Sequence, residues 1–188
     1  MRALLLPGIV TPAAVGSAPL LEALGDAVDA RAKELEVYRD DEPPPEYSLA
    51  LEVEGVLRAA DEAGWDRFHL VGYSGGGAVA TVMAVTRPER LASLALLEPA
   101  WTGRQGQSEA ERAAREEFDG LEALPPDALM REFTRAQLAP GVAPPPLFPD
   151  FTAEVFEERH HFDPPHRAEP ERLAASLVAH WRRAEPSR

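Results

Sequence analysis

Apolar residues alternate along the first hundred positions between short continuous runs and longer stripes with a spacing of three to four. Continuous runs are typical of strands buried on both faces, and the stripes are typical of helices that pack on a sheet. Strands are predicted over residues 2–6, 34–38, 68–72 and 91–97. Helices are predicted over residues 20–28, 47–63 and 77–85, with Gly64 ending the second. This alternation predicts an α/β fold, a mostly parallel sheet wrapped by helices.

The pattern changes after Trp101, where polar amphipathic stripes replace the buried runs. Residues 101–139 are interpreted as a small helical cap inserted into the domain, and residues 140–151 as a stiff proline-rich linker. The remaining predicted elements are helices over 109–124, 127–138 and 173–181 and a strand over 152–159. The whole chain, residues 1–188, is therefore expected to be one domain with one insertion.

Composition narrows the class of protein. The 188 residues include no cysteine, which excludes a disulfide scaffold, a thiolate nucleophile and a cysteine-ligated metal. A net charge of -13 argues against nucleic acid or an anionic membrane as a partner. No apolar run approaches the roughly 18 residues that a membrane span needs. Prolines interrupt the apolar N-terminus, so we expect no signal peptide and a cytoplasmic location.

One short motif carries chemistry. Gly72-Tyr73-Ser74-Gly75-Gly76 matches G-x-S-x-G and lies between a predicted strand and a predicted helix. From the glycine and serine frequencies, about 0.03 such matches are expected by chance in a chain of this length, before the strand and helix are required. A serine on such a sharp turn has strained backbone angles and needs neighbours without bulk. The motif therefore predicts a nucleophile elbow, against the alternative of a structural glycine turn with an idle serine.

A serine hydroxyl needs a base to become a nucleophile, and histidine is the usual one. His160, His161 and His166 follow the last predicted strand, where a side chain could reach across to the elbow. His69 lies inside a predicted strand and is interpreted as a packed or surface residue. A metal site is not expected, because adjacent histidines on a strand point to opposite faces and no carboxylate-rich partner motif accompanies them.

With the loop Leu6-Pro7-Gly8-Ile9 and the tail His161-Phe162-Asp163-Pro164-Pro165, the elbow resembles the α/β-hydrolase family of the esterase and lipase type. The resemblance implies that Ser74 is the nucleophile and that the amides of Ile9 and Gly75 form the oxyanion hole. It also implies that His161 is the base, with His160 as the runner-up. The chain departs from the family at Pro7, where a histidine is common.

The acid of the triad is the second departure. In the family it usually follows a strand that lies between the cap and the last strand, and residues 140–152 leave no room for that strand and its helix. Glu98 follows the predicted strand 91–97 and keeps the chain order serine, acid, histidine. Asp150 and Asp163 are weaker candidates. The alternative for Glu98 is a carboxylate that fixes the loop into the cap.

These residues predict a serine hydrolase that cleaves a carboxylic ester or related acyl compound through an acyl-enzyme, without a cofactor. Tyr73 and Trp101 are expected to contact the small-molecule substrate. The alternative is a hydrolase-like domain that binds a small molecule or a partner with weak or no catalysis, because the acid-bearing strand is absent. A missing strand would also leave a sheet edge open, which a homodimer could cover.

Overall fold

The structure is a computed structural model that describes residues 1–40, 42–100, 152, 154, 156, 161 and 163–185. The chain divides into two compact units, one of Met1–Trp101 with His166–Arg188 and one of Thr102–Pro165. The strands are β1 (Arg2–Leu6), β2 (Asp29–Ala32), β3 (Phe68–Tyr73) and β4 (Leu91–Leu97). The α-helices are α1 (Ala13–Gly16), α2 (Ala18–Leu24), α3 (Leu49–Glu62), α4 (Gly75–Thr86), α7 (Pro165–Ala168) and α8 (Pro170–Ala184). Single 3₁₀ turns form η1 (Gly25–Ala27), η2 (Glu36–Tyr38) and η3 (Pro88–Arg90).

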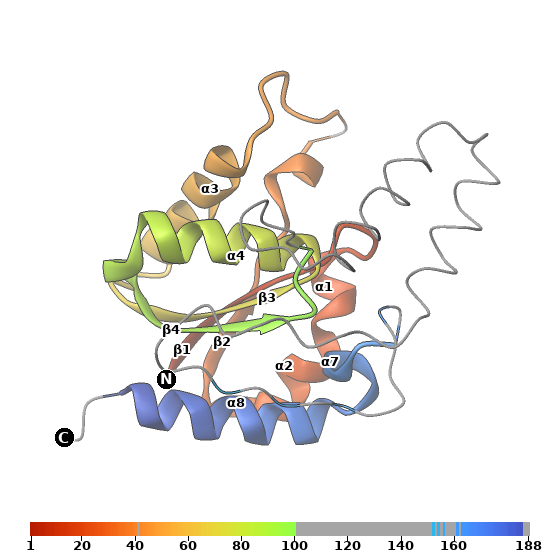
Figure 1. Cartoon of the computed structure of the whole chain (residues 1–188), viewed down its shortest axis with the longest axis vertical. Coiled ribbons are helices and arrows are strands. Elements are labelled where there is room, and N and C mark those ends of the chain that lie inside the picture. Colours follow the sequence, from red (N-terminus) through yellow and green to blue (C-terminus); the bar gives the residue numbers. More distant parts are fainter. Residues whose placement is uncertain are drawn as a thin grey trace, which may run out of the picture. The chain divides into compact units, whose positions relative to one another are not determined.

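The four described strands form one parallel sheet in the order β2-β1-β3-β4. The chain runs from β1 outward to β2, returns across β1 to β3, and continues to β4. Helices α3 and α4 cover one face of the sheet, and α2 and α8 cover the other (Figure 1). The order therefore reverses between β1 and β3, which is the place where open α/β sheets bind ligands at the carboxyl ends of their strands. The predicted α/β class is confirmed.

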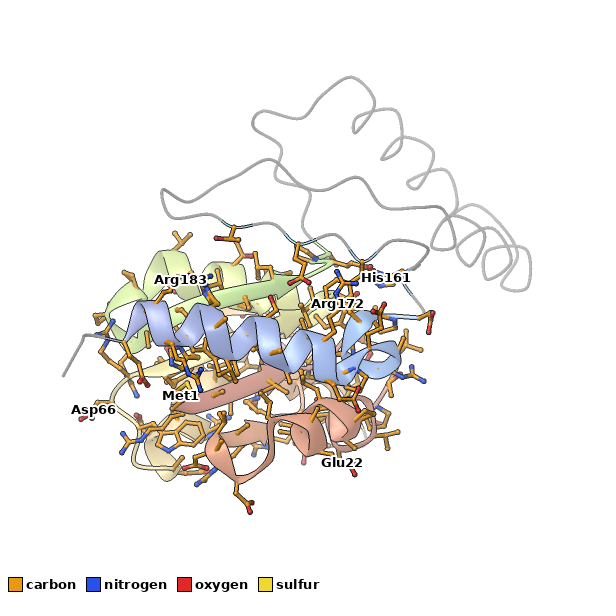
Figure 2. The ribbon with its side chains drawn as sticks, turned by 90° about the horizontal axis from the view of Figure 1, so that it is seen from below. Met1, Glu22, Asp66, His161, Arg172 and Arg183 are labelled. Atoms are coloured by element: carbon orange, nitrogen blue, oxygen red, sulfur yellow. The ribbon has the colours of Figure 1, made fainter. Side chains whose placement is uncertain are left out.

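The central strands are buried on both faces, which explains their continuous apolar runs. On β1 and β3, Leu4, Leu6, Phe68 and Leu70 belong to the core that packs against α3 and α4. The intervening side chains point to the opposite face, where the ring of His69 stacks on Trp181 of α8 with centroids 5.1 Å apart. Figure 2 shows the molecule from this face, with α8 lying across the sheet. Helix α8 buries a stripe with helical spacing: Leu173, Ala174, Leu177 and Trp181.

The second strand is where the sequence prediction was wrong. Residues 34–38 do not form a strand; β2 lies earlier, at Asp29–Ala32, and residues 36–38 form η2. β2 lies at the edge among the described strands, and its residues are alternately exposed and half-buried, so it has no apolar run. The first predicted helix also ends sooner, at Leu24, because Gly25 adopts a φ of 55°. The predicted end of α3 is confirmed, with Gly64 at a φ of 70° just beyond it.

The cap and linker predicted over residues 101–151 lie outside the described residues, except that the structure assigns Thr102–Pro165 to the second compact unit. Of the strand predicted over 152–159, residues 152, 154 and 156 are described and have no regular secondary structure. The closing helix is confirmed and extends beyond the predicted 173–181 in both directions. Among the helices that the structure describes, none has the length and apolar character needed to cross a membrane.

Candidate active site

Ser74 occupies the turn between β3 and α4, as the motif predicts. Its φ of 49° and ψ of -117° are strongly unfavourable for a residue with a side chain, at a cost of about 1–3 kcal/mol. Both backbone groups of this residue bond to the end of β4 and to the residues just after it. The Ser74 amide donates to the Leu97 carbonyl at 3.1 Å, and the Ser74 carbonyl accepts from the Ala100 amide at 2.8 Å. These bonds fix the strained turn and the segment after β4 to each other.

The glycines at both ends of the motif allow strand and helix to approach closely. A Cβ atom on Gly72 would lie 2.5 Å from the Gly76 carbonyl oxygen and 2.8 Å from the Ala80 Cβ. One on Gly76 would lie 2.7 Å from the Leu6 Cβ and would also overlap the Pro7 carbonyl oxygen. Any side chain at either position would push α4 away from β1 and β3. The elbow therefore requires glycine here for packing, as expected for a G-x-S-x-G turn.

Two backbone amides beside Ser74 are available to bind an anion. Gly75 begins α4, so its N–H is one of the donors that a helix leaves unused at its N-terminus. Ile9 follows β1, and its side chain lies against Gly75, with Cγ2 2.6 Å from the position of a Cβ on that glycine. Within the described residues, neither the Ile9 nor the Gly75 amide donates a hydrogen bond. Paired donors at this place are the arrangement that stabilises an oxyanion in acyl transfer.

The structure also brings Glu98 and Tyr73 to this edge of the sheet. Tyr73 ends β3, and Glu98 follows β4 with a φ of 43°, between Leu97 and Ala100, which both bond to Ser74. Burial raises the pKa of the Tyr73 phenol, and the negative charge of Glu98 raises it further. The Tyr73 ring packs on the buried ring of His166, with centroids 4.5 Å apart. Tyr73 is therefore a neutral phenol at physiological pH, and the Glu98 residue lies close to the elbow.

The histidine of the predicted triad belongs to the other compact unit. His161 is a half-buried turn residue within Thr102–Pro165, as is Asp163, so the pairing of His161 with Ser74 stays a prediction. His160, Trp101 and Asp150 lie outside the described residues. His69 is buried in the layer of α8, which confirms that it is a packed residue.

One contact of the loop of residues 6–9, which carries the predicted oxyanion donor, was not predicted from the sequence. The Tyr38 hydroxyl on η2 donates to the Ile9 carbonyl at 2.7 Å. No local pattern marks this tyrosine, because its partner lies 29 residues earlier in the chain. The contact depends on the parallel pairing of β1 with β2, which brings the segments that follow both strands to the same edge of the sheet. Only the folded topology reveals it.

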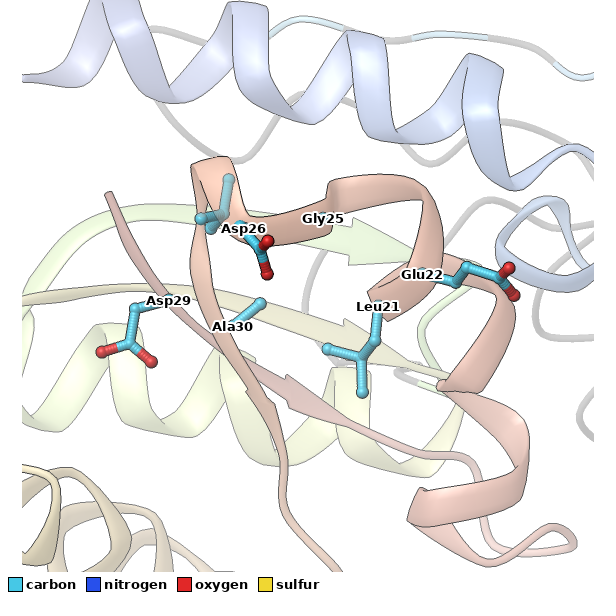
Figure 3. Close-up of a pocket in the computed structure, with 7 residues that line it drawn as sticks. Leu21, Glu22, Gly25, Asp26, Asp29 and Ala30 are labelled. Atoms are coloured by element: carbon cyan, nitrogen blue, oxygen red, sulfur yellow. The ribbon is translucent and has the colours of Figure 1, made fainter.

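A separate open hollow lies at the other end of the strands. Its lining residues come from α2, η1 and the start of β2 (Figure 3): Leu21, Glu22, Gly25, Asp26, Val28, Asp29 and Ala30. Asp29 pairs in register with Arg2, at the start of β1, whereas Ser74 follows the end of β3. The hollow is therefore not part of the site at Ser74. Among the described residues, no cluster of histidine and carboxylate groups is arranged to hold a metal ion.

Comparison with known proteins agrees with this topology and this elbow. The family described as alpha/beta hydrolase fold matches residues 39–143, more than half of the chain. The matched segment includes the strand, the serine turn and the helix that form the elbow. The protein belongs to the α/β-hydrolase family.

Individual relatives match over shorter or more distant stretches. The chain is 36% identical over 84 residues to the dihydrolipoyllysine-residue acetyltransferase component of the acetoin cleaving system of Cupriavidus necator, covering 44% of this chain and 22% of that protein. A bacterial membrane phospholipase A superposes with a TM-score of 0.55 at 20% identity, over 97% of this chain and 53% of the other. A serine hydrolase from Cycloclasticus zankles gives 0.51 at 19% identity, over 73% and 48%. The chain thus spans about half the length of these structures, and the likeness to them shows the fold.

Proposed function

We propose that the protein is a serine hydrolase that cleaves a carboxylic ester or related acyl compound of small size. The observation that carries this proposal is the strained Ser74 turn beside two amides that donate no hydrogen bond within the described residues. A structural turn has no need of a strained serine, whereas a nucleophile gains from being held on one. The family supplies the hydrolase class, and the ester substrate and the triad are our proposal.

In this mechanism the Ser74 hydroxyl attacks the substrate carbonyl carbon, and its proton passes to the imidazole of His161. The carbonyl oxygen becomes negative and accepts hydrogen bonds from the Ile9 and Gly75 amides. The bond to the alcohol breaks, and the alcohol leaves with the proton from His161. Water then gives a proton to His161 and attacks the acyl-enzyme, which releases the acid and restores Ser74. Glu98 would orient the imidazole and stabilise its charged form.

The surface around the predicted oxyanion loop supports an apolar acyl group. Ile9, Val10 and Val15 are large hydrophobic residues, and they are 54%, 69% and 66% exposed. Ile9 and Val10 lie in the loop after β1 at the carboxyl edge of the sheet, and Val15 lies on the short helix that follows. An ester with a short aliphatic acyl chain would bury part of this surface on binding. Charged acyl groups are disfavoured for the same reason.

The test is hydrolysis of p-nitrophenyl acetate and p-nitrophenyl butyrate by the native chain, Ser74→Ala and His161→Ala. We expect turnover by the native chain, with the butyrate preferred, and a loss of about 10³-fold or more in kcat in either variant. The matched control for His161→Ala is His180→Ala, because His180 lies on α8 outside the site.

Activity that survives Ser74→Ala would refute the mechanism. A folded native chain that binds these esters without cleaving them would favour the hydrolase-like binding domain instead.

A further inference from the structure

The Gly8–Ile9 peptide, which carries the Ile9 amide, lies between two anchored peptides. On one side, the Pro7 carbonyl accepts a hydrogen bond of 3.0 Å from the Gly76 amide of α4. On the other side, the Ile9 carbonyl accepts a hydrogen bond of 2.7 Å from the Tyr38 hydroxyl. The first bond ties the loop to the elbow. The second is made by a side chain that comes from a different connection of the sheet, between β2 and α3.

Hydrogen bonds and ion pairs hold the turn η2, which carries Tyr38. The carboxylate of Glu52 on α3 is fully buried and accepts hydrogen bonds from the Glu36 and Val37 amides, at 2.8 Å and 3.1 Å. The Glu36 carboxylate pairs with Lys33 at 3.0 Å and with Arg58 at 2.8 Å. Burial raises the pKa of Glu36, but the hydrogen bond and the charge of Lys33, with the charge of Arg58, hold it below its usual value. These contacts hold η2 in place, so the backbone of Tyr38 has a fixed position.

The same connection also holds the far end of the loop. The Glu34 carboxylate accepts a hydrogen bond of 2.7 Å from the Ala13 amide, at the start of α1. Its other oxygen accepts one of 3.1 Å from the Leu35 amide. The side chains of Tyr38 and Glu34, which both precede α3, thus form hydrogen bonds to the two ends of this loop. An exposed loop without such bonds samples several backbone conformations. Conformations that misalign a catalytic group lower the rate.

We propose that Tyr38 is a positioning residue for the oxyanion hole, whose hydroxyl holds the Ile9 carbonyl and thereby aims the Ile9 amide at the developing negative charge. This inference rests on the proposed function. The hydroxyl acts on the loop backbone, so its removal should weaken binding of the tetrahedral state more than binding of the planar substrate. An aligned donor is worth most in the transition state, where the oxygen bears its charge.

The experiment compares Tyr38→Phe with Thr86→Val in the full chain. Each substitution removes one hydroxyl from an exposed residue, and each hydroxyl donates to a backbone carbonyl. The Thr86 hydroxyl donates to the Val82 carbonyl at 2.8 Å. Thr86 ends α4, at the opposite end of that helix from Ser74. The readouts are kcat and KM for p-nitrophenyl butyrate and inhibition by a trifluoromethyl ketone, which forms a tetrahedral adduct with a serine. Circular dichroism confirms that each variant is folded at the assay temperature.

For Tyr38→Phe we expect kcat to fall about tenfold, KM to stay within about twofold, and the trifluoromethyl ketone to inhibit about tenfold more weakly. Thr86→Val should match the native chain in all three. Native kinetics in Tyr38→Phe would overturn the inference, and so would a raised KM with unchanged kcat, which would make Tyr38 a contact for the planar substrate. If the native chain itself fails to cleave the ester, the proposed function fails first, and the two failures are thereby distinguished.

Discussion

We predict that His69 makes the stability of this protein depend on pH. The residue is 1% exposed, its ring stacks on Trp181, and its Nδ1 lies 2.9 Å from the Ser93 hydroxyl oxygen. Nε2 lies 3.7 Å from the half-exposed carboxylate of Glu185. Burial lowers the pKa of His69 from 6.5 to about 4, because the Glu185 charge only partly offsets the loss of water. The folded protein therefore keeps this imidazole neutral at pH values where the unfolded chain protonates it.

The size of the effect follows from the two pKa values. Between pH 6.5 and pH 4 the unfolded chain binds one proton more than the folded chain at this residue, so the free energy of unfolding falls as the pH falls. The full shift corresponds to about 3 kcal/mol, of which about 2 kcal/mol is lost between pH 7 and pH 5. This contribution is fully present only above pH 6.5. Such a loss is a large share of the stability of a domain of this size.

The assay is urea unfolding of the native chain and His69→Gln at pH 7, 6 and 5, followed by circular dichroism. His69→Gln cannot take up the proton, so its free energy of unfolding should fall by about 2 kcal/mol less than that of the native chain between pH 7 and pH 5. His180→Gln is the comparison, since burial also lowers the pKa of His180, a less buried residue on α8. Equal pH dependence in His69→Gln and the native chain would refute the reasoning.

Three further outcomes follow from the packing and the site. Gly76→Ala should lower the free energy of unfolding by about 3 kcal/mol or more in urea, because the added Cβ would overlap β1 and the loop beyond it. Gly16→Ala is the control and should be close to neutral, because the nearest contact of its Cβ would be at 3.4 Å. Glu98→Gln should lower kcat for p-nitrophenyl butyrate about a hundredfold or more with little change in melting temperature; a lower melting temperature at full activity would make Glu98 a structural carboxylate instead. Trp181→Ala should cost about 3–5 kcal/mol in urea unfolding, against less than about 0.5 kcal/mol for the exposed Arg182→Ala, and a near-native Trp181→Ala would show that α8 contributes little to the core.

The central strands and the elbow could be predicted because their sequence signals are local. Buried parallel strands require runs such as Arg2–Leu6, and the turn at Ser74 requires small residues at fixed positions around the serine. The strand β2 could not be predicted, because it lies at the edge of the described sheet, and an edge strand needs no apolar run. The apolar Leu35 and Val37 instead pack against the α3 and α4 side of the sheet, so a strand was assigned to the wrong residues.

The positions of the candidate site residues could be predicted as far as the motif extends. Ser74, Gly75, Ile9 and Glu98 lie together because they follow neighbouring parallel strands, whose carboxyl ends share one edge. The role of Tyr38 could not be predicted, since a single hydrogen bond between distant residues leaves no periodic trace in the chain. The buried carboxylate of Glu52 was missed for the same reason. It looks like an ordinary polar helix residue until its two amide partners are known.

The most direct test of the central claim is reaction of the purified chain with a fluorophosphonate probe, followed by mass spectrometry of its peptides. The probe phosphonylates a serine only where a base activates it and amides stabilise the oxygen, so it reports the assembled site without a known substrate. We predict one label per chain, on Ser74, and none in Ser74→Ala. A folded native chain that takes no label, or a Ser74→Ala chain that is still labelled, would contradict the assignment of Ser74 as the nucleophile.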